Sequence, residues 1–229
     1  MKRIVVLTGA GMSAESGLKT FRDAGGLWEG HDVMEVASLD GWYKNKELVL
    51  EFYNQRRKQL LEVEPNKGHQ LLAELEKKYD VQIVTQNVDD LHERAGSKNV
   101  LHLHGELFKV KSVRDDHLIY NWKKDLHIGD TNEKGDQLRP AIVWYGEAVP
   151  MLDKAIKITK SADILVIIGT SMQVYPAASL IHYIQPETPV YFIDPKPNIH
   201  KNSYDNLTII AKKANVGVEK LIELIDQTD

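Results

Sequence analysis

Four apolar runs rich in β-branched residues most constrain the fold of this 229-residue chain. They cover residues 3–8, 81–87, 162–170 and 189–194, and a shorter candidate covers 99–105. Continuous apolar runs of this length are typical of strands buried on both faces of a parallel sheet. Helical patterns lie between them, at 46–62, 67–78, 151–160 and 216–227. Strands that alternate with helices predict an α/β protein with a doubly wound parallel sheet.

Two stretches do not follow this alternation, and they predict a smaller lobe. Residues 27–66 form a long helical insertion, and residues 107–141 are polar, charged and rich in turn residues. The predicted division is therefore a Rossmann-like main domain of residues 1–26, 67–106 and 142–229, with the small lobe formed by the two insertions.

Composition excludes several classes of protein. The chain has no cysteine, which excludes a disulfide framework, a thiolate zinc site and a cysteine nucleophile. A net charge of −4 without a basic stripe argues against binding to nucleic acid. No apolar run approaches the ~20 residues that span a membrane, and the chain begins without a secretory leader pattern. We expect a cytoplasmic protein that associates with neither nucleic acid nor membrane.

A glycine-rich turn follows the first strand, in LTGAGMSAESGLKTFR. Gly9, Gly11 and Ala14 satisfy the pattern G-x-G-x-x-G/A, in which small residues let backbone N–H groups approach a pyrophosphate. A tight turn that needs glycine only for steric reasons satisfies the same pattern. The usual acidic residue about 20 positions on, at the end of a second strand, is missing. The turn alone therefore does not establish a dinucleotide site.

Polar side chains also follow other strands, at the edge of the sheet where ligands bind. Gln86, Asn87 and Asp89 can hydrogen-bond an amide or a sugar, although a loop that caps the next helix explains them as well. His104, in LHLHGEL, is suited to be a general base because its ordinary pKa is near 6.5. His102 lies on the same face of that strand, but without a third ligand the pair does not predict a metal site.

Five segments, in this order and spacing, resemble the sirtuin family of NAD-dependent protein lysine deacylases. They are GAGMSAESGLKTFR, TQNVDDLHERAG, HLHGEL, VWYGE and GTSMQVYPAA. The resemblance runs from about Val5 to Ala214 and is strongest to the bacterial desuccinylase and deacetylase subclass. It implies an NAD cofactor and an acylated lysine on an extended peptide that lies between the two lobes. The implied products are the free lysine, nicotinamide and O-acyl-ADP-ribose.

The resemblance implies a role for individual residues. His104 would activate the ribose hydroxyl, Asn87 would orient the ribose, and Asp89 would hold the nicotinamide amide. The other NAD-binding residues that it implies are Gly9, Ala10, Gly11, Ser13, Ala14, Phe21, Arg22, Trp28, Gln86, Gly169, Thr170, Ser171, Asp194 and Ala214. The implied peptide-binding residues are Val143, Tyr145, Gly146, Glu147 and Val174.

Tyr53 and Arg56 stand at i and i+3 of the helix predicted over 46–62, so they share one face. A guanidinium matches the planar shape of a carboxylate, and the phenol adds a donor. In sirtuins that remove succinyl and malonyl groups, such a pair binds the acyl carboxylate, and an alanine at the position of Ala37 makes room for it. The resemblance therefore implies removal of succinyl and malonyl groups, with acetyl as a further candidate. Arg57 and Lys58 are predicted to be solvated.

One departure from the family is large. Sirtuins usually carry two C-x-x-C pairs between the HGEL and RP segments, and this interval has no cysteine. His117 and His127 fit no structural zinc spacing, so we predict no zinc. The candidates for a local core in its place are Leu118, Ile119, Tyr120 and Trp122.

Two other functions stay open on the same scaffold. One is a regulatory module that binds NAD or ADP-ribose, and the other is an NAD hydrolase or ADP-ribosyltransferase. Nicotinamide release that depends on an acylated peptide separates a deacylase from both. We expect a monomer.

Overall fold

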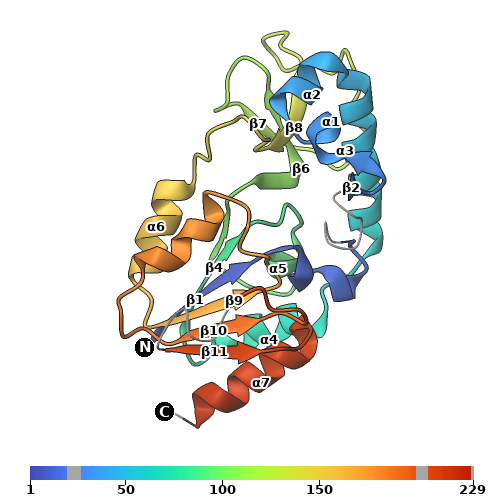
Figure 1. The fold of residues 1–229 in the computed structure, drawn as a ribbon. Helices are drawn as coiled ribbons and strands as arrows, with labels where there is room; N and C mark the ends of the chain where they lie inside the picture. Colours follow the sequence, from blue (N-terminus) through green and yellow to red (C-terminus); the bar gives the residue numbers. More distant parts are fainter. Residues whose placement is uncertain (20–26, 200–205, 228–229) are drawn as a thin grey trace.

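The computed structural model describes residues 1–19, 27–199 and 206–227, and its centre is a parallel sheet in the order β11-β10-β9-β1-β4-β5 (Figure 1). The strands are β1 (Arg3–Thr8), β4 (Asp80–Thr85), β5 (Val100–His102), β9 (Ile164–Ile168), β10 (Val190–Ile193) and β11 (Leu207–Ile210). Thr8, at the end of β1, lies level with Thr85 of β4 and Ile168 of β9. The strand order reverses at β1, so the carboxyl ends of these three strands form the edge where open parallel sheets bind ligands.

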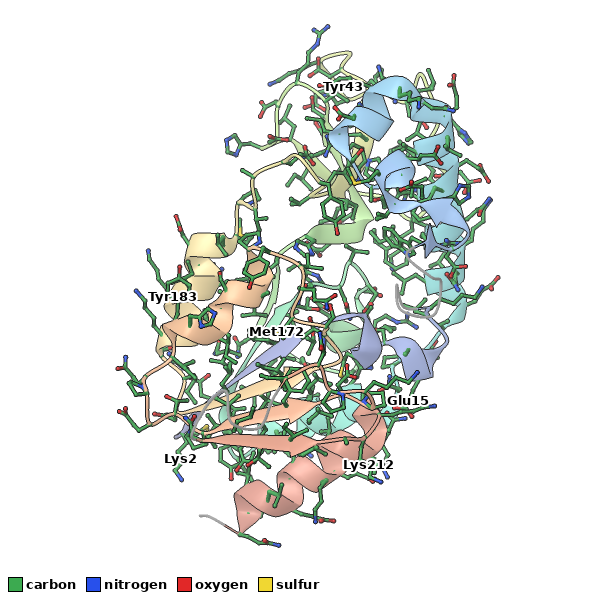
Figure 2. All side chains as sticks on the ribbon, viewed as in Figure 1. Lys2, Glu15, Tyr43, Met172, Tyr183 and Lys212 are labelled. Atoms are coloured by element: carbon green, nitrogen blue, oxygen red, sulfur yellow. The ribbon has the colours of Figure 1, made fainter. Side chains whose placement is uncertain are left out.

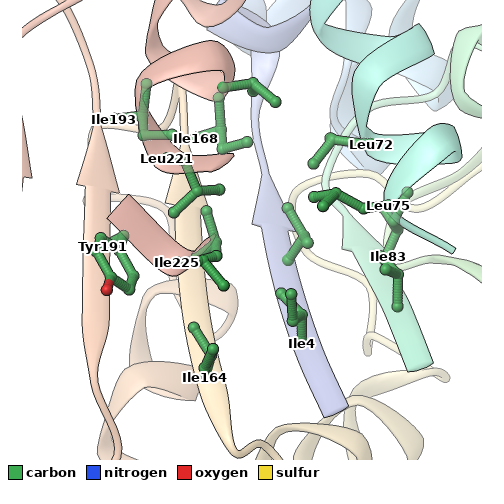
Figure 3. Close-up of a cluster of buried hydrophobic side chains, with 14 of the residues drawn as sticks. Ile4, Leu72, Leu75, Ile83, Ile164, Ile168, Tyr191, Ile193, Leu221 and Ile225 are labelled. Atoms are coloured by element: carbon green, nitrogen blue, oxygen red, sulfur yellow. The ribbon is translucent and has the colours of Figure 1, made fainter. Parts of the chain in front are cut away.

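Helices cover both faces of this sheet. They are α4 (Lys67–Leu75), α6 (Leu152–Lys160), α7 (Ala214–Asp226) and the 3-10 helix η3 (Ala177–Tyr183). On one face, Leu72 of α4 and Leu221 of α7 belong to the same buried cluster as Ile4 of β1 (Figure 3). On the other face, Leu180 of η3 packs in a cluster with Val5. Both faces of β1 are therefore buried, which is why its sequence is a continuous apolar run.

The predicted α/β class and parallel sheet are confirmed, with shorter bounds for most strands. All four predicted helices are present, and the helix over 46–62 has the predicted bounds. The sequence reading missed β11. Among the described strands it pairs with β10 alone, and its two middle residues are exposed or half-buried, so it lacks the fully buried apolar pattern of the central strands.

The smaller lobe contains both a helical layer and an antiparallel sheet (Figure 1). Its helices are α1 (Val33–Val36), α2 (Leu39–Lys44) and α3 (Lys46–Glu62), preceded by the short strands β2 (Leu27–Trp28) and β3 (His31–Asp32). Its sheet has the order β7-β6-β8, from β6 (Gly105–Ser112), β7 (Ile119–Asn121) and β8 (Leu138–Ile142). Residues 107–141 therefore contain strands that were not predicted, and 27–32 is not helical.

Helix α3 has clear boundaries. The side chain of Asn45 accepts a hydrogen bond from the amide of Leu48 at 3.0 Å, which caps its first turn. The helix ends at Glu62 because the next residues are extended ahead of Pro65. Phe52 and Leu60 bury one side of it in a cluster with Leu126.

Two predictions for the small lobe were wrong. Arg57 is 1% exposed, because α3 is buried on more than one side. Ile119 is 52% exposed and so cannot anchor a local core, whereas Tyr120 and Trp122 are partly buried and pack against the apolar cluster of the small lobe. The buried apolar anchors lie elsewhere, at Val110, Leu126 and Leu138. Lys58, by contrast, is exposed as predicted and pairs with Asp125 at 2.9 Å.

Among the helices that the structure describes, none has the length and apolar character needed to cross a membrane.

Candidate active site

Two glycine turns meet at the edge of the sheet, one after β1 and one after β9. The amide of Gly9 donates to Ile168 O at 3.0 Å, and the amide of Gly11 donates to Gly169 O at 2.9 Å. A Cβ at Gly9 would lie 2.8 Å from Gly169 O, and a Cβ at Gly11 would lie 2.6 Å from Gly169 Cα. Gly169 itself has a φ of +62°. All three glycines are needed for this close approach of backbone to backbone.

The first turn continues into two 3-10 turns, η1 (Ala10–Met12) and η2 (Ala14–Ser16). The amide of Ser13 donates to Ala10 O at 3.1 Å, so it is already used within the turn. In the described part of the chain, the amide of Ala10 has no acceptor. The predicted set of amides for a pyrophosphate is therefore reduced, because those of Gly9, Gly11 and Ser13 donate to carbonyls of the protein.

Asn87 and Asp89 lie against this turn. Nδ2 of Asn87 donates to Gly9 O at 3.1 Å and to Ser13 Oγ at 3.2 Å. Ser13 Oγ donates to Asp89 Oδ2 at 2.9 Å, and Asp89 Oδ1 accepts from the amide of Leu91 at 3.2 Å. Burial raises the pKa of Asp89 to about 6, although these two donors act in the other direction. The loop thus holds a buried carboxyl whose charge changes near neutral pH.

His104 precedes β6 and points its Nδ1 at the carbonyl of Gln86, 3.1 Å away. A carbonyl only accepts, so Nδ1 carries the hydrogen and Nε2 is left with a free lone pair. Burial lowers the pKa of His104, which keeps the ring neutral at pH 7. Gly105, at φ +83°, permits this placement, since a Cβ there would collide with Ala141 O. His104 is therefore poised as a general base.

The remaining predicted ligand residues follow other strands of the same sheet. Nε2 of Gln86 donates to Thr170 Oγ1 at 3.2 Å, which joins the loops after β4 and β9, and Ser171 follows on that loop. Asp194 follows β10, is buried, and accepts from the amide of Lys196 at 2.8 Å. Ala214 is buried at the start of α7. Asp194 and Ala214 thus lie farther along the sheet edge than Asn87 and His104.

The predicted peptide-binding segment joins the site to the small lobe. The amide of Val143 donates to His104 O at 2.9 Å, and the amide of Tyr145 donates to Ala37 O at 2.9 Å. Gly146 is exposed with a φ of +91°. The carboxylate of Glu147 pairs with Arg139 at 2.7 Å and accepts from the amide of Trp144 at 2.8 Å. The side chain of Glu147 therefore stabilises the peptide-binding segment through contacts inside the protein.

The opposite segment follows β9, on the loop that carries Met172 (Figure 2). Val174 is half-buried there, and its carbonyl accepts from the amide of Ala178. Tyr175 is 69% exposed.

Tyr53 and Arg56 lie one turn apart on α3, as predicted. Tyr53 is fully buried, and its hydroxyl accepts a hydrogen bond from Trp144 Nε1 at 2.9 Å. Nε and Nη1 of Arg56 are buried without a partner in the described residues, while its guanidinium lies 5.0 Å from the centre of the Phe52 ring. Trp28 packs edge-on against Tyr53, with ring centres 6.1 Å apart. Burial lowers the pKa of Arg56 and raises that of Tyr53.

Sequence reasoning missed several residues that organise this site. Thr8, Thr85 and Trp144 stand at strand ends or next to predicted motifs. Nothing in the sequence around them indicates that they take part in a site. Phe21 and Arg22 lie outside the described residues. In the described part of the chain, no group of three histidine, aspartate or glutamate side chains could hold a metal ion.

An open parallel sheet with glycine turns at its reversal point and a neutral histidine beside them defines a nucleotide-binding α/β enzyme. Comparison with known proteins identifies the family within this class. The model of the Sir2 family matches residues 9–176. The chain belongs to the Sir2 family, and it is an NAD-dependent protein deacylase.

Relatives and solved structures agree with this assignment. An NAD-dependent protein deacylase of Helicobacter pylori (strain ATCC 700392 / 26695) is 64% identical over 230 residues, covering 98% of this chain and 99% of the relative. A solved complex of a Sir2 homologue with NAD is similar with a TM-score of 0.88 and 37% identity, covering 99% of this chain and 90% of that chain. A structure of Sir2 bound to an acetylated peptide has a TM-score of 0.79 and 27% identity, covering 97% and 93%.

Proposed function

We propose that this deacylase removes succinyl and malonyl groups from protein lysine side chains, with acetyl groups as further substrates. The observation that carries the proposal is the state of Arg56. Two of its buried donor nitrogens have no partner among the described residues. Leaving buried charged donors unsatisfied costs free energy, which a bound carboxylate would recover.

The hydroxyl of Tyr53 supports the same ligand. An indole nitrogen only donates, so the bond from Trp144 uses a lone pair of the phenol oxygen and leaves its hydrogen free. Burial holds the pKa of Tyr53 far above neutral, so that hydrogen stays in place. Tyr53 and Arg56 would together offer a phenol donor and a guanidinium fork to one acyl carboxylate.

The protonation states of His104 and Asp89 support the catalytic roles that the family resemblance implies. Nε2 of His104, with its free lone pair, would take the proton from a ribose hydroxyl as that hydroxyl attacks the acyl group. Asn87 would orient the ribose through its side-chain amide. Asp89 would accept hydrogen bonds from the nicotinamide amide in its ionised form.

NAD fits the edge of the sheet where the glycine turns meet. The turns expose backbone without Cβ atoms, and the free amide of Ala10 is available to a phosphate oxygen. NAD supplies the ribose that accepts the acyl group and the nicotinamide that leaves. Its adenosine half would lie toward Thr170, Ser171, Asp194 and Ala214.

The protein substrate would bind as an extended strand between Tyr145 to Glu147 and Gln173 to Tyr175. The solved relative with an acetylated peptide supports a peptide ligand of this kind. The exposed positions of Tyr145 and Tyr175 are consistent with a surface that contacts a partner chain.

The test of the acyl preference is a comparison of kcat/KM on acetyl-, succinyl- and malonyl-lysine versions of one peptide. Wild type should process the acidic groups at least as well as acetyl. Arg56→Met should lower kcat/KM for the succinyl peptide on the order of 10- to 100-fold, as expected for loss of a hydrogen-bonded ion pair. The acetyl peptide, which has no carboxylate to bind, should change by less than about threefold.

A matched control comes from the same helix. Lys58→Met also removes one positive charge from α3, but Lys58 is exposed and paired with Asp125. It should alter neither substrate by more than about twofold, since exposed ion pairs contribute little. Equal losses on succinyl and acetyl peptides in Arg56→Met would refute the proposed specificity.

A further inference from the structure

The backbone of Asn87 is held at both ends by side chains from neighbouring elements. Its amide donates to Thr85 Oγ1 at 3.0 Å, and that oxygen is 2.8 Å from Thr8 Oγ1. Its carbonyl lies 3.0 Å from Nδ1 of His102. Residues 86–90 belong to neither helix nor strand, so side-chain contacts of this kind determine how Asn87 is oriented.

His102 is tied to a second acceptor on its other side. Its Nε2 lies 2.7 Å from Oε1 of Glu93, on α5 (Leu91–Arg94). A carbonyl and a carboxylate can only accept, so both ring nitrogens must donate, which requires the imidazolium form. The His102 side chain is only 8% exposed, whereas the side chain of Glu93 is 39% exposed, so the bond to the Asn87 carbonyl is the more sheltered of the two.

We infer that His102, charged through Glu93, is a positioning residue that fixes the carbonyl of Asn87 and thereby aims its side chain during deacylation. In this backbone orientation the Asn87 amide group reaches Gly9 O and Ser13 Oγ. His102 itself has no bond to the glycine turns or to His104. The inference uses the role proposed above for Asn87.

Two isosteric substitutions separate the two bonds of His102. In His102→Asn, the amide nitrogen takes the place of Nδ1 and can still donate to the Asn87 carbonyl. In His102→Gln, the amide nitrogen takes the place of Nε2 and can reach Glu93 but not Asn87. Both variants lose the ring and the charge, so general effects on packing are shared between them.

We expect His102→Gln to lower kcat for deacylation on the order of tenfold, which is typical for loss of one hydrogen bond from a charged donor. His102→Asn should stay within about threefold of wild type, because the weaker neutral bond is retained. Binding of ADP, which lacks the ribose that Asn87 would orient, should be unchanged in both when measured by calorimetry, which shows that the fold is intact. Equal losses of kcat, or a larger loss in His102→Asn, would overturn the inference.

The carboxylate partner is tested by pH. Glu93→Gln keeps an acceptor for Nε2 but removes the charge that favours the imidazolium, so the alkaline fall in kcat should move to lower pH. The other ionisable groups that face this pair in the described residues are Glu106 of β6, His92 of α5, Asp89, and Lys109, which pairs with Glu106 at 2.6 Å. These are unchanged in the variant. An alkaline limb at the wild-type position would contradict the role of Glu93.

A double-mutant cycle distinguishes this inference from the role of Asn87 itself. If His102 acts through Asn87, adding His102→Gln to Asn87→Ala should cause little further loss of kcat. Additive losses would show that His102 acts by another route. If Asn87→Ala alone retained full activity, the proposed role of Asn87 would be wrong and the inference would fall with it. If Asn87→Ala lost activity while His102→Gln did not, only the inference about His102 would be wrong.

Discussion

Hydrogen-bond partners determine where the protons lie on His104, Tyr53 and His102. The Gln86 carbonyl gives His104 a free Nε2, the indole of Trp144 leaves the Tyr53 hydrogen free, and two acceptors keep His102 charged. None of these partners is an unusual residue. Their effect comes from being donor-only or acceptor-only groups at short distance.

Asp89 leads to a prediction about pH at the residue scale. Its folded pKa of about 6 is higher than its ordinary value, so the carboxylate is lost as pH falls through about 6. Protonation of Asp89 should weaken its hold on nicotinamide, and protonation of His104 should then remove the base. The acid limb of log kcat/KM for NAD should therefore approach a slope of two in wild type.

Asp89→Asn should reduce that limiting slope to one, because His104 is then the remaining one of these two groups whose protonation lowers activity. Asp90→Asn is the neighbouring control, since Asp90 is half-buried beside Arg94 and has no bond to Ser13. It should keep the wild-type profile. A slope of two that persisted in Asp89→Asn would exclude Asp89 as the titrating group.

Some residues of the site could be predicted from the sequence, and others could not. His104, Asn87 and Asp89 stand in motifs at strand ends, and parallel strands bring those ends together. The contacts of Thr8, Thr85 and Trp144 depend on strand register and on packing between lobes. Those quantities have no local signature, so these residues were missed.

At the scale of elements, helix α3 serves two purposes on different sides. One side carries Tyr53 and Arg56. Another side carries Asn54, whose side chain donates to Leu126 O at 3.1 Å and accepts from the amide of Leu126 at 2.8 Å. Arg57 extends this contact, with Nη1 2.6 Å from Asn54 Oδ1 and Nε 3.2 Å from Leu107 O.

Arg57 was misread because charged neighbours on α3 suggested a solvated face. The helix is instead enclosed by α1, β2 and the antiparallel sheet, and only Lys58 of the two residues reaches water. The bounds of α3 were predictable because caps and Pro65 are local signals. The strands β6 and β7 were not, since polar residues interrupt them and they are only partly buried. Strand β8 is buried throughout, but Arg139 and Pro140 interrupt its apolar run.

The two buried polar residues of α3 should differ in their effect on stability. Asn54→Ala leaves two backbone groups of Leu126 unsatisfied and should lower the free energy of unfolding by roughly 2–4 kcal/mol. Arg57→Met leaves only Leu107 O unsatisfied and removes a buried charge whose Nη2 has no partner, so its cost should be smaller. Urea unfolding at pH 7 measures both values. A larger loss of unfolding free energy in Arg57→Met than in Asn54→Ala would mean that the charge of Arg57 itself stabilises the small lobe.

At the scale of the whole molecule, the small lobe is held without cysteine ligands. Asp136, which is 7% exposed, accepts from Ser112 Oγ at 2.9 Å and from Asn132 Nδ2 at 3.3 Å. This joins the end of β6 to the chain entering β8. The apolar cluster around Val110, Leu126 and Leu138 then connects the antiparallel sheet to α3.

The last prediction concerns metal dependence. A structural zinc contributes on the order of 10 kcal/mol to folding, so its removal would unfold a lobe that relied on it. In this protein, hydrogen bonds and apolar contacts stabilise the small lobe in place of a zinc site. Excess EDTA should therefore leave both the urea midpoint and deacylase activity unchanged. Asp136→Ala should lower the urea midpoint, because Ser112 and Asn132 lose their shared buried acceptor at a cost of roughly 1–3 kcal/mol. A loss of stability in EDTA that added zinc restored would show that the lobe holds a metal after all.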